Sequence, residues 1–101
     1  MTIKNGMRAI HPGEVLREEF MKPLGLSANA LANALGVTAA RVNEIAKETR
    51  GITADTALRL ARYFNSTPKF WLNLQTSYDL AVAAEARSEE IAKTVHPREA
   101  A

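Results

Sequence analysis

The chain contains no cysteine among its 101 residues. A disulfide framework and a thiolate metal site are therefore excluded, and the absence of thiols is consistent with a reducing cytoplasm. The sequence has no run of about 18 apolar residues, the length that a transmembrane helix needs. Its first residues also lack an apolar stretch long enough for a secretory signal. These absences predict a cytoplasmic protein that makes no membrane contact.

The motifs of several common enzyme sites are absent as well. The sequence has no HExxH zinc pair, no glycine-rich phosphate loop and no GxSxG turn. Glu18 and Glu19 are neighbours, so on a helix they point in different directions and form a poor acid–base pair. His11 and His96 lie far apart and each precede a proline, which favours a cap and a terminus over metal ligands. We therefore predict that the protein is not an enzyme and has no catalytic residue, metal or cofactor.

The net charge of +2 is too small to indicate a nucleic-acid partner by itself, but its distribution is uneven. Residues 38–69 contain six basic and three acidic residues, whereas residues 70–101 contain three basic and five acidic ones. A basic middle suits a phosphate-binding surface, and an acidic end suits a separate partner surface. The alternative is that both are ordinary solvated helix faces.

The sequence shows no strand-like alternation and no internal repeat, and it divides into five helices, which predicts an all-α fold. The first helix begins at Pro12, a favoured first helical residue. It should stop near Met21, because the residue before Pro23 is biased away from helix. The fifth helix opens at Thr67–Pro68 and is long, extending to about Thr94.

Three shorter helices lie between the first and the fifth. Ser27 and Thr38 are the predicted N-caps of the second and third helices. Thr53 caps the fourth, which begins at Ala54. Gly36 ends the second helix, at a position where a left-handed backbone suits glycine.

Residues 27–47, SANALANALGVTAARVNEIAK, have the pattern of two short helices that cross at a tight turn. Ala32 is small enough for a close crossing, Gly36 tolerates the turn, and Val37 fills the corner between the helices. The residues expected to face inward are Leu31, Leu35, Val42 and Ile45. The pattern predicts a helix-turn-helix whose second helix enters the major groove of DNA. The alternative is a plain αα-hairpin in a helical bundle.

The motif, residues 28–47, resembles the helix-turn-helix of the phage-repressor (Cro/C1, or XRE) class. Residues 11–80, with HPGE, RGITADTALRLA and FWLNLQ, resemble more narrowly the HigA-type antitoxins of bacterial toxin–antitoxin modules. The resemblance implies a five-helix phage-repressor-like domain with a long C-terminal helix. It also implies a homodimer that binds double-stranded operator DNA and represses its own operon, and so is nucleoid-associated when bound. A second implied partner is a RelE-like toxin, a ribosome-dependent ribonuclease that the antitoxin neutralises.

The expected organisation follows from the helices and the resemblance together. Residues 1–11 form a flexible N-terminus, and residues 12–66 form the DNA-binding domain around the reading motif. Residues 67–95 form a C-terminal helix that packs on the domain and dimerises, and residues 96–101 form a tail.

The predicted DNA-binding residues lie at the exposed ends and outer faces of the helix-turn-helix and near it. They are Ser27, Asn29, Thr38, Ala39, Ala40, Arg41, Asn43, Glu44, Lys47, Arg50 and Lys69. The sequence departs from the family pattern, because alanines stand at two outward positions of the reading helix and can touch only a thymine methyl group. Direct readout then rests on Thr38, Asn43 and Lys47, with Arg41 as a further candidate.

Three other charged residues of the set have distinct expected roles. Glu44 could accept a hydrogen bond from a cytosine amino group or reject phosphate. Arg50 is expected to contact phosphate, and the alternative is a solvated loop arginine. Lys69 lies in the first turn of the fifth helix, where a bound phosphate would offset the unfavourable helix dipole; the alternative is a simple surface lysine.

The fifth helix carries two sets of apolar residues. One set, together with Phe64 at the end of the fourth helix, is expected in the core or the dimer interface rather than as a platform for bases; it consists of Phe70, Trp71, Leu74 and Tyr78. Residues on other faces would stay exposed in a monomer and form the predicted dimer interface, which consists of Leu72, Leu80, Val82, Ala84 and Ile91.

Two other functions remain as alternatives. One is a stand-alone phage-repressor-like regulator without a toxin. The other is a helical protein-interaction module that has lost DNA binding, which Ala39 and Ala40 favour and Lys47 and Arg50 oppose.

Overall fold

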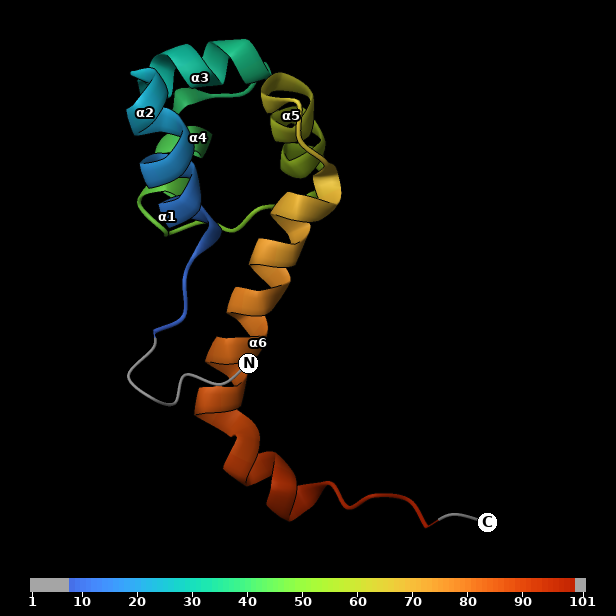
Figure 1. Ribbon diagram of the computed structural model, residues 1–101. Coiled ribbons are helices and arrows are strands. Elements are labelled where there is room, and N and C mark those ends of the chain that lie inside the picture. The colour runs from blue at the N-terminus through green and yellow to red at the C-terminus, as the bar shows by residue number, and fades with distance from the viewer. Residues whose placement is uncertain (1–7, 100–101) are drawn as a thin grey trace.

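The computed structural model describes residues 8–99, which form helices and connecting loops with no strand (Figure 1). The first helical stretch consists of α1 (Pro12–Val15), η1 (Leu16–Met21) and α2 (Lys22–Leu24). The remaining helices are α3 (Ala28–Leu35), α4 (Ala39–Ala46), α5 (Ala54–Phe64) and α6 (Pro68–Thr94). The elements before α6 form a rounded head, from which α6 runs away as a long arm. Of the predicted N-terminus and tail, residues 1–7 and 100–101 lie outside the described residues.

The helix starts follow the predicted caps. A side-chain hydroxyl accepts a hydrogen bond from the backbone N–H three residues later at Ser27, Thr38, Thr53 and Thr67. Gly36 ends α3 with a φ of 71°, in the left-handed region, as predicted. The five-helix, all-α prediction is therefore confirmed within residues 8–99, and α6 ends at the predicted Thr94. No described helix is long and apolar enough to cross a membrane.

The first helix does not stop near Met21, so that prediction was wrong. Helical winding continues through Pro23 to Leu24, and the six residues of η1 form a π-helix. The N–H of Lys22 donates to the carbonyl of Arg17, five residues earlier. In an α-helix, the ring of Pro23 would clash with the carbonyl four residues earlier. The wider π turn relieves this crowding and carries the helix past the proline.

The core lies inside the head and extends to Trp71 in the first turn of α6. Trp71 is completely buried, and its indole N–H donates to the hydroxyl of Ser66 at 3.0 Å. Its ring lies 4.9 Å from that of Phe20 and 6.3 Å from that of Phe64. Aromatic rings of three separate elements therefore fasten the arm to the head.

Leu72 differs in exposure from the other residues of the predicted dimer interface. It was expected to be exposed in a monomer, but it is half-buried and packs against the core, because the first turns of α6 lie along α5. The predicted interface residues farther along α6 are exposed in the single chain, as expected. Leu80, Val82 and Ile91 are 65%, 43% and 49% exposed, and Ala84 is exposed too.

His11 forms a second link between α6 and the head. It is buried, its Nδ1 accepts the backbone N–H of Gly13 at 2.8 Å, and its ring meets that of Tyr78 edge-on at 4.8 Å. Gly13 lies so close to the carbonyl of Ile45 that any side chain there would collide with α4. The predicted cap role of His11 is confirmed.

We expect His11 to make stability depend on pH. Burial lowers the pKa of His11, so between its folded and unfolded pKa values the unfolded chain binds the extra proton. The contribution is fully present above the unfolded pKa of about 6.5 and is lost as pH falls below it, by at most about 1.4 kcal/mol per pH unit. Urea unfolding of His11→Asn, which keeps a capping oxygen, should show a weaker loss between neutral and mildly acidic pH. His96→Asn, at an exposed histidine, serves as the control. Parallel pH profiles for the parent and His11→Asn would contradict this role.

Candidate nucleic-acid interface

α3 and α4 cross at a short turn whose residues play their predicted parts. Ala32 at the crossing is 2% exposed. The N–H of Val37 donates to the carbonyl of Ala32 at 3.0 Å, and the Val37 side chain packs against the core. The four residues predicted to face inward are all buried: Leu31, Leu35, Val42 and Ile45. The two helices thus have the predicted inner faces, and the opposite face of α4 points outward.

The structure places the candidate DNA-binding residues at the surface, though not all to the same degree. Those that are exposed are Ser27, Asn29, Thr38, Ala40, Asn43, Lys47, Arg50 and Lys69. Those that are half-buried are Ala39, Arg41 and Glu44. The residues from 38 to 50 share one continuous region of α4 and the loop after it. Lys69 is in the first turn of α6, and its side chain makes no hydrogen bond or ion pair with another residue between 8 and 99.

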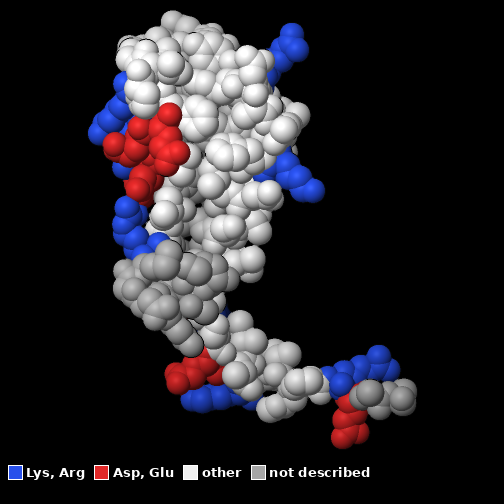
Figure 2. Space-filling view, viewed as in Figure 1, with Lys and Arg blue, Asp and Glu red and all other residues white. Residues whose placement is uncertain are grey.

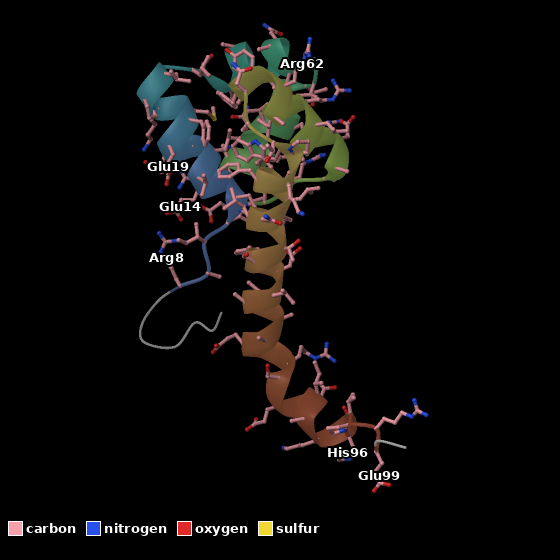
Figure 3. All side chains as sticks on the ribbon, turned by 45° about the vertical axis from the view of Figure 1, so that its right-hand side comes forward. Arg8, Glu14, Glu19, Arg62, His96 and Glu99 are labelled. Atoms are coloured by element: carbon pink, nitrogen blue, oxygen red, sulfur yellow. The ribbon has the colours of Figure 1, made fainter. Side chains whose placement is uncertain are left out.

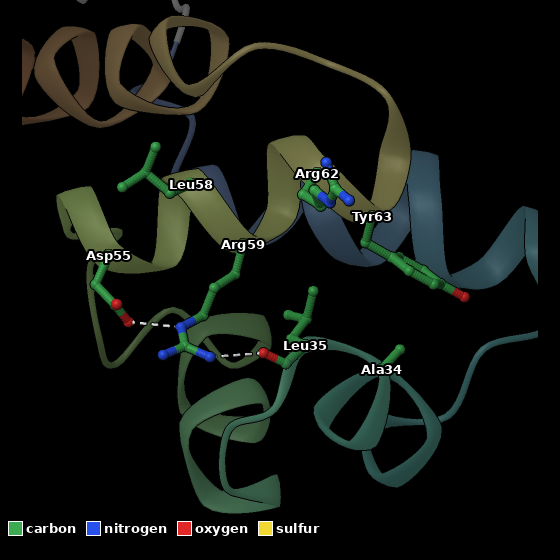
Figure 4. Close-up of a pocket in the computed structure, with 7 residues that line it drawn as sticks. All are labelled: Ala34, Leu35, Asp55, Leu58, Arg59, Arg62 and Tyr63. Atoms are coloured by element: carbon green, nitrogen blue, oxygen red, sulfur yellow. Dashed lines mark hydrogen bonds and ion pairs between the residues drawn. The ribbon is translucent and has the colours of Figure 1, made fainter.

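Arg59 of α5 stabilises the turn between α3 and α4. Its guanidinium donates to the carbonyls of Leu35 and Gly36 at 2.9 and 3.3 Å, which satisfies the C-terminal end of α3. Its Nε also donates to Asp55 at 2.9 Å, as Figure 4 shows. Asp55 accepts from Arg41 of α4 at 3.0 Å as well. Hydrogen bonds from Arg59 and then Arg41 lower the pKa of Asp55, so its carboxylate stays charged and ties α3, α4 and α5 together.

The loop from Lys47 to Thr53 is held at both ends. Arg17 of η1 donates to the carbonyl of Ala46 and pairs with Glu48 at 3.3 Å. At the other end, the side-chain oxygen of Gln75 in α6 accepts the N–H of Ile52 at 2.6 Å. These contacts fix a loop that would otherwise have few backbone partners, and they set the direction in which it presents Arg50.

Arg50 forms an ion pair with Glu44 on the outer face of α4, with Nε and Oε1 2.7 Å apart. The side chains are 48% and 45% exposed, so water reaches both. Arg50 thus extends back over the reading helix. This pair brings together two of the predicted DNA-binding residues.

Sequence reasoning missed Arg17, Arg59 and Gln75, which position the interface. Arg17 and Arg59 reach carbonyls 29 and 24 residues away, and Gln75 accepts an N–H 23 residues away. No periodicity marks such contacts. The one local signal was the spacing of four between Asp55 and Arg59, which is typical of an ion pair on a helix.

Acidic side chains gather on another part of the head, the flank formed by α1 and η1 (Figure 2). Glu14 and Glu19 project from this flank, whereas Arg62 lies at the top of the view in Figure 3. Most of this acidic charge is paired: Glu14 binds Arg8 at 2.6 Å, and Glu18 binds Lys22 at 2.9 Å.

An open groove of about 500 Å³ lies between α3 and α5. Its lining consists of Ala34, Leu35, Asp55, Leu58, Arg59, Arg62 and Tyr63 (Figure 4). Three of these residues are already joined by hydrogen bonds, because Arg59 donates to both Asp55 and the carbonyl of Leu35. Across residues 8–99 there is no cluster of histidine and acidic residues that could hold a metal ion.

Comparison with known proteins agrees with this geometry. A family model described as helix-turn-helix matches residues 18–72. Virulence-associated protein I of Dichelobacter nodosus is 65% identical over 82 residues, which are 81% of this chain and 76% of that protein. Antitoxin HigA-1 of Vibrio cholerae is 38% identical over 96 residues, 93% of this chain and 88% of that protein.

A solved structure described as Pseudomonas aeruginosa antitoxin HigA with higBA promoter superimposes with a TM-score of 0.88. It is 49% identical and covers 91% of this chain and 100% of its own. None of these three descriptions names an enzyme. The match over more than half of the chain, the relatives and the shared arrangement of helices agree, so this chain belongs to the helix-turn-helix family and, within it, to the group of HigA-type antitoxins.

Proposed function

We propose that this chain is a sequence-specific DNA-binding antitoxin that represses its own toxin–antitoxin operon and neutralises a RelE-like ribonuclease toxin. One observation carries the DNA-binding part. Buried Val42 and Ile45 hold α4 against the core, so that Asn43 and Lys47 on its other face are exposed. A short helix presented in this way fits the major groove, which is about 12 Å wide. The HigA structure described with the higBA promoter supports this use of the fold.

The proposed contacts divide into readers of bases and binders of phosphate. Thr38, Asn43 and Lys47 lie where the N-terminal end and outer face of α4 meet base edges. Ala40 can contribute only an apolar contact with thymine. Arg50, on the loop after α4, contacts phosphate, and the remaining members of the predicted set lie around this centre.

The antitoxin part rests on the relatives, one of which is named antitoxin HigA-1. Its test is co-expression of the full chain with the product of the adjacent reading frame, followed by affinity purification. A neutralising antitoxin should co-purify with that product and restore growth that the product alone suppresses. A chain that binds DNA but neither binds nor neutralises this product would be a stand-alone regulator.

We also propose that residues 12–66 read DNA while residues 67–95 join two copies. One small reading helix contacts few base pairs, so two copies on neighbouring half-sites are needed for useful affinity. The exposed apolar residues of α6 beyond Tyr78 offer a self-complementary surface, which a two-fold partner would bury. The operator should then be an inverted repeat with half-sites about 34 Å apart.

The phosphate role of Arg50 predicts a change in the salt dependence of binding. Arg50→Ala should weaken binding to every duplex alike and reduce the slope of log affinity against log salt by about 0.9, the value for one phosphate contact. Fluorescence anisotropy across a salt series measures both quantities. The matched control is Arg8→Ala, because Arg8 also pairs with a glutamate, but on the acidic flank of α1 and η1. An unchanged slope in Arg50→Ala would remove Arg50 from the interface.

The reading role of Asn43 predicts a change at a single base position. Asn43→Ala should cost about 1–3 kcal/mol at that position and relax its preference, because an asparagine–adenine contact uses two hydrogen bonds. Selection from a randomised duplex library, run with both proteins, gives the two preferences. Asn73→Ala, at an exposed asparagine of α6, is the control. The same preferred sequence for parent and Asn43→Ala would show that Asn43 does not read a base.

The dimer predicts a mass of twice 11.0 kDa for the full chain. Sedimentation at micromolar concentration should show this species for the parent and a monomer for Leu80→Lys, since a buried lysine without a partner disrupts an interface. Leu24→Lys is a matched control, because Leu24 on α2 is 63% exposed, nearly as much as Leu80. A parent that sediments as an 11 kDa species, together with a protected site that lacks an inverted repeat, would refute the dimer.

A further inference from the structure

The pair between Glu44 and Arg50 has a consequence for DNA binding, because it joins two side chains of the proposed interface. Arg50 is the cation proposed to bind phosphate, and in the free chain its Nε already donates to Glu44 at 2.7 Å. A duplex whose phosphate binds the Nε side of Arg50 must therefore replace this carboxylate. It must also accommodate the negative charge of Glu44 close to its own phosphates.

We propose that Glu44 is a specificity-determining residue that lowers affinity for general DNA by competing with phosphate for Arg50. The proposal rests on the proposed DNA-binding function and adds a role for one carboxylate within it. When Arg50 moves to phosphate, the carboxylate of Glu44 loses its partner. A cytosine amino group in the major groove can then donate to it, and a duplex that lacks such a donor leaves it unpaired. The preferred sequence alone recovers the lost interaction.

The Glu44–Arg50 pair is strong enough to favour one DNA sequence over another but too weak to prevent binding. Both side chains are about half exposed, and an ion pair in contact with water shifts an equilibrium by at most about fivefold. Phosphate can therefore displace Glu44 readily. The like charge of an unpaired carboxylate near phosphates adds to this penalty on every duplex that gives it no donor.

A second ion pair, between Arg41 and Asp55, is less free to exchange its carboxylate for a DNA phosphate. Asp55 also accepts from Arg59, whose guanidinium holds the carbonyls at the end of α3. Loss of Asp55 would therefore disturb the turn as well as release Arg41. The carboxylate of Glu44 has Arg50 as its one partner among residues 8–99, and its backbone carbonyl, bonded to Thr49, is unaffected by a change of side chain.

The test compares Glu44→Gln with Glu19→Gln, which makes the same change of net charge on η1. Full-length proteins are titrated by fluorescence anisotropy onto a mixed-sequence duplex and onto the duplex that the parent selects from a random library. Glu44→Gln should bind the mixed-sequence duplex about threefold to tenfold more tightly than the parent, because Arg50 no longer has to leave a carboxylate and no unpaired charge then faces the phosphates. Its affinity for the selected duplex should not rise, so the ratio between the two duplexes falls. Glu19→Gln should keep the ratio of the parent.

The same substitution in an Arg50→Gln background separates the pair from simple charge repulsion. If Glu44 acts by holding Arg50, most of the gain on mixed-sequence DNA should disappear when Arg50 is absent. A gain that persists in full, an equal gain on both duplexes, or no difference between Glu44→Gln and Glu19→Gln would each overturn the proposal. Failure of the proposed function looks different, because the parent itself would then prefer no sequence and show no dependence on salt.

Discussion

The burial of Trp71 is the interaction on which the remainder of the structure depends. One side chain at the base of α6 fills the space between η1, α5 and the arm, and its indole N–H is satisfied by Ser66. Large buried aromatic rings contribute a major share of the stability of a small core, and the polar edge of this one adds direction to the contact. The head and arm are therefore joined by a packed cluster rather than by a hinge.

The presentation of α4 depends in turn on what lies behind it. Three long polar side chains from three different elements, Arg17, Arg59 and Gln75, reach backbone groups at the end of α3, the end of α4 and the loop that follows. Each satisfies a carbonyl or N–H that would otherwise need water. The surface proposed to meet DNA thus owes its shape to residues that do not face DNA.

Much of this architecture was predictable from the sequence because it is encoded locally. Hydroxyl caps at Ser27 and Thr38, glycine at position 36 and the apolar spacing of α3 and α4 each act within a few residues, and all were placed as expected. The π-helix before Pro23 was not foreseen, since proline normally marks the end of a helix.

The details of the candidate site were less predictable, because they depend on contacts between distant segments. The exposed residues of α4 follow from its periodicity, but nothing local shows that Arg41 meets Asp55 or that Leu72 packs inward. The spacing of apolar residues in the sequence indicates which face of a helix is apolar. How far along the helix that face is buried depends on the element packed against it. For α6 the cover ends soon after Tyr78, which only the assembled structure shows.

Because α6 is long, a small change of its direction at the base produces a large displacement at its far end. Its 27 residues span about 40 Å at 1.5 Å per residue. From Trp71 to Thr94 the helix extends about 35 Å, so a tilt of about 5° at Trp71 would displace the far end by roughly 3 Å, close to the rise of about 3.4 Å between successive base pairs. In a dimer joined through α6, a small change in the packing around Trp71 would therefore move the far end of the helix by about one base-pair spacing. The packing of Trp71 therefore limits how accurately the spacing of two DNA-binding heads can match the helical repeat of DNA.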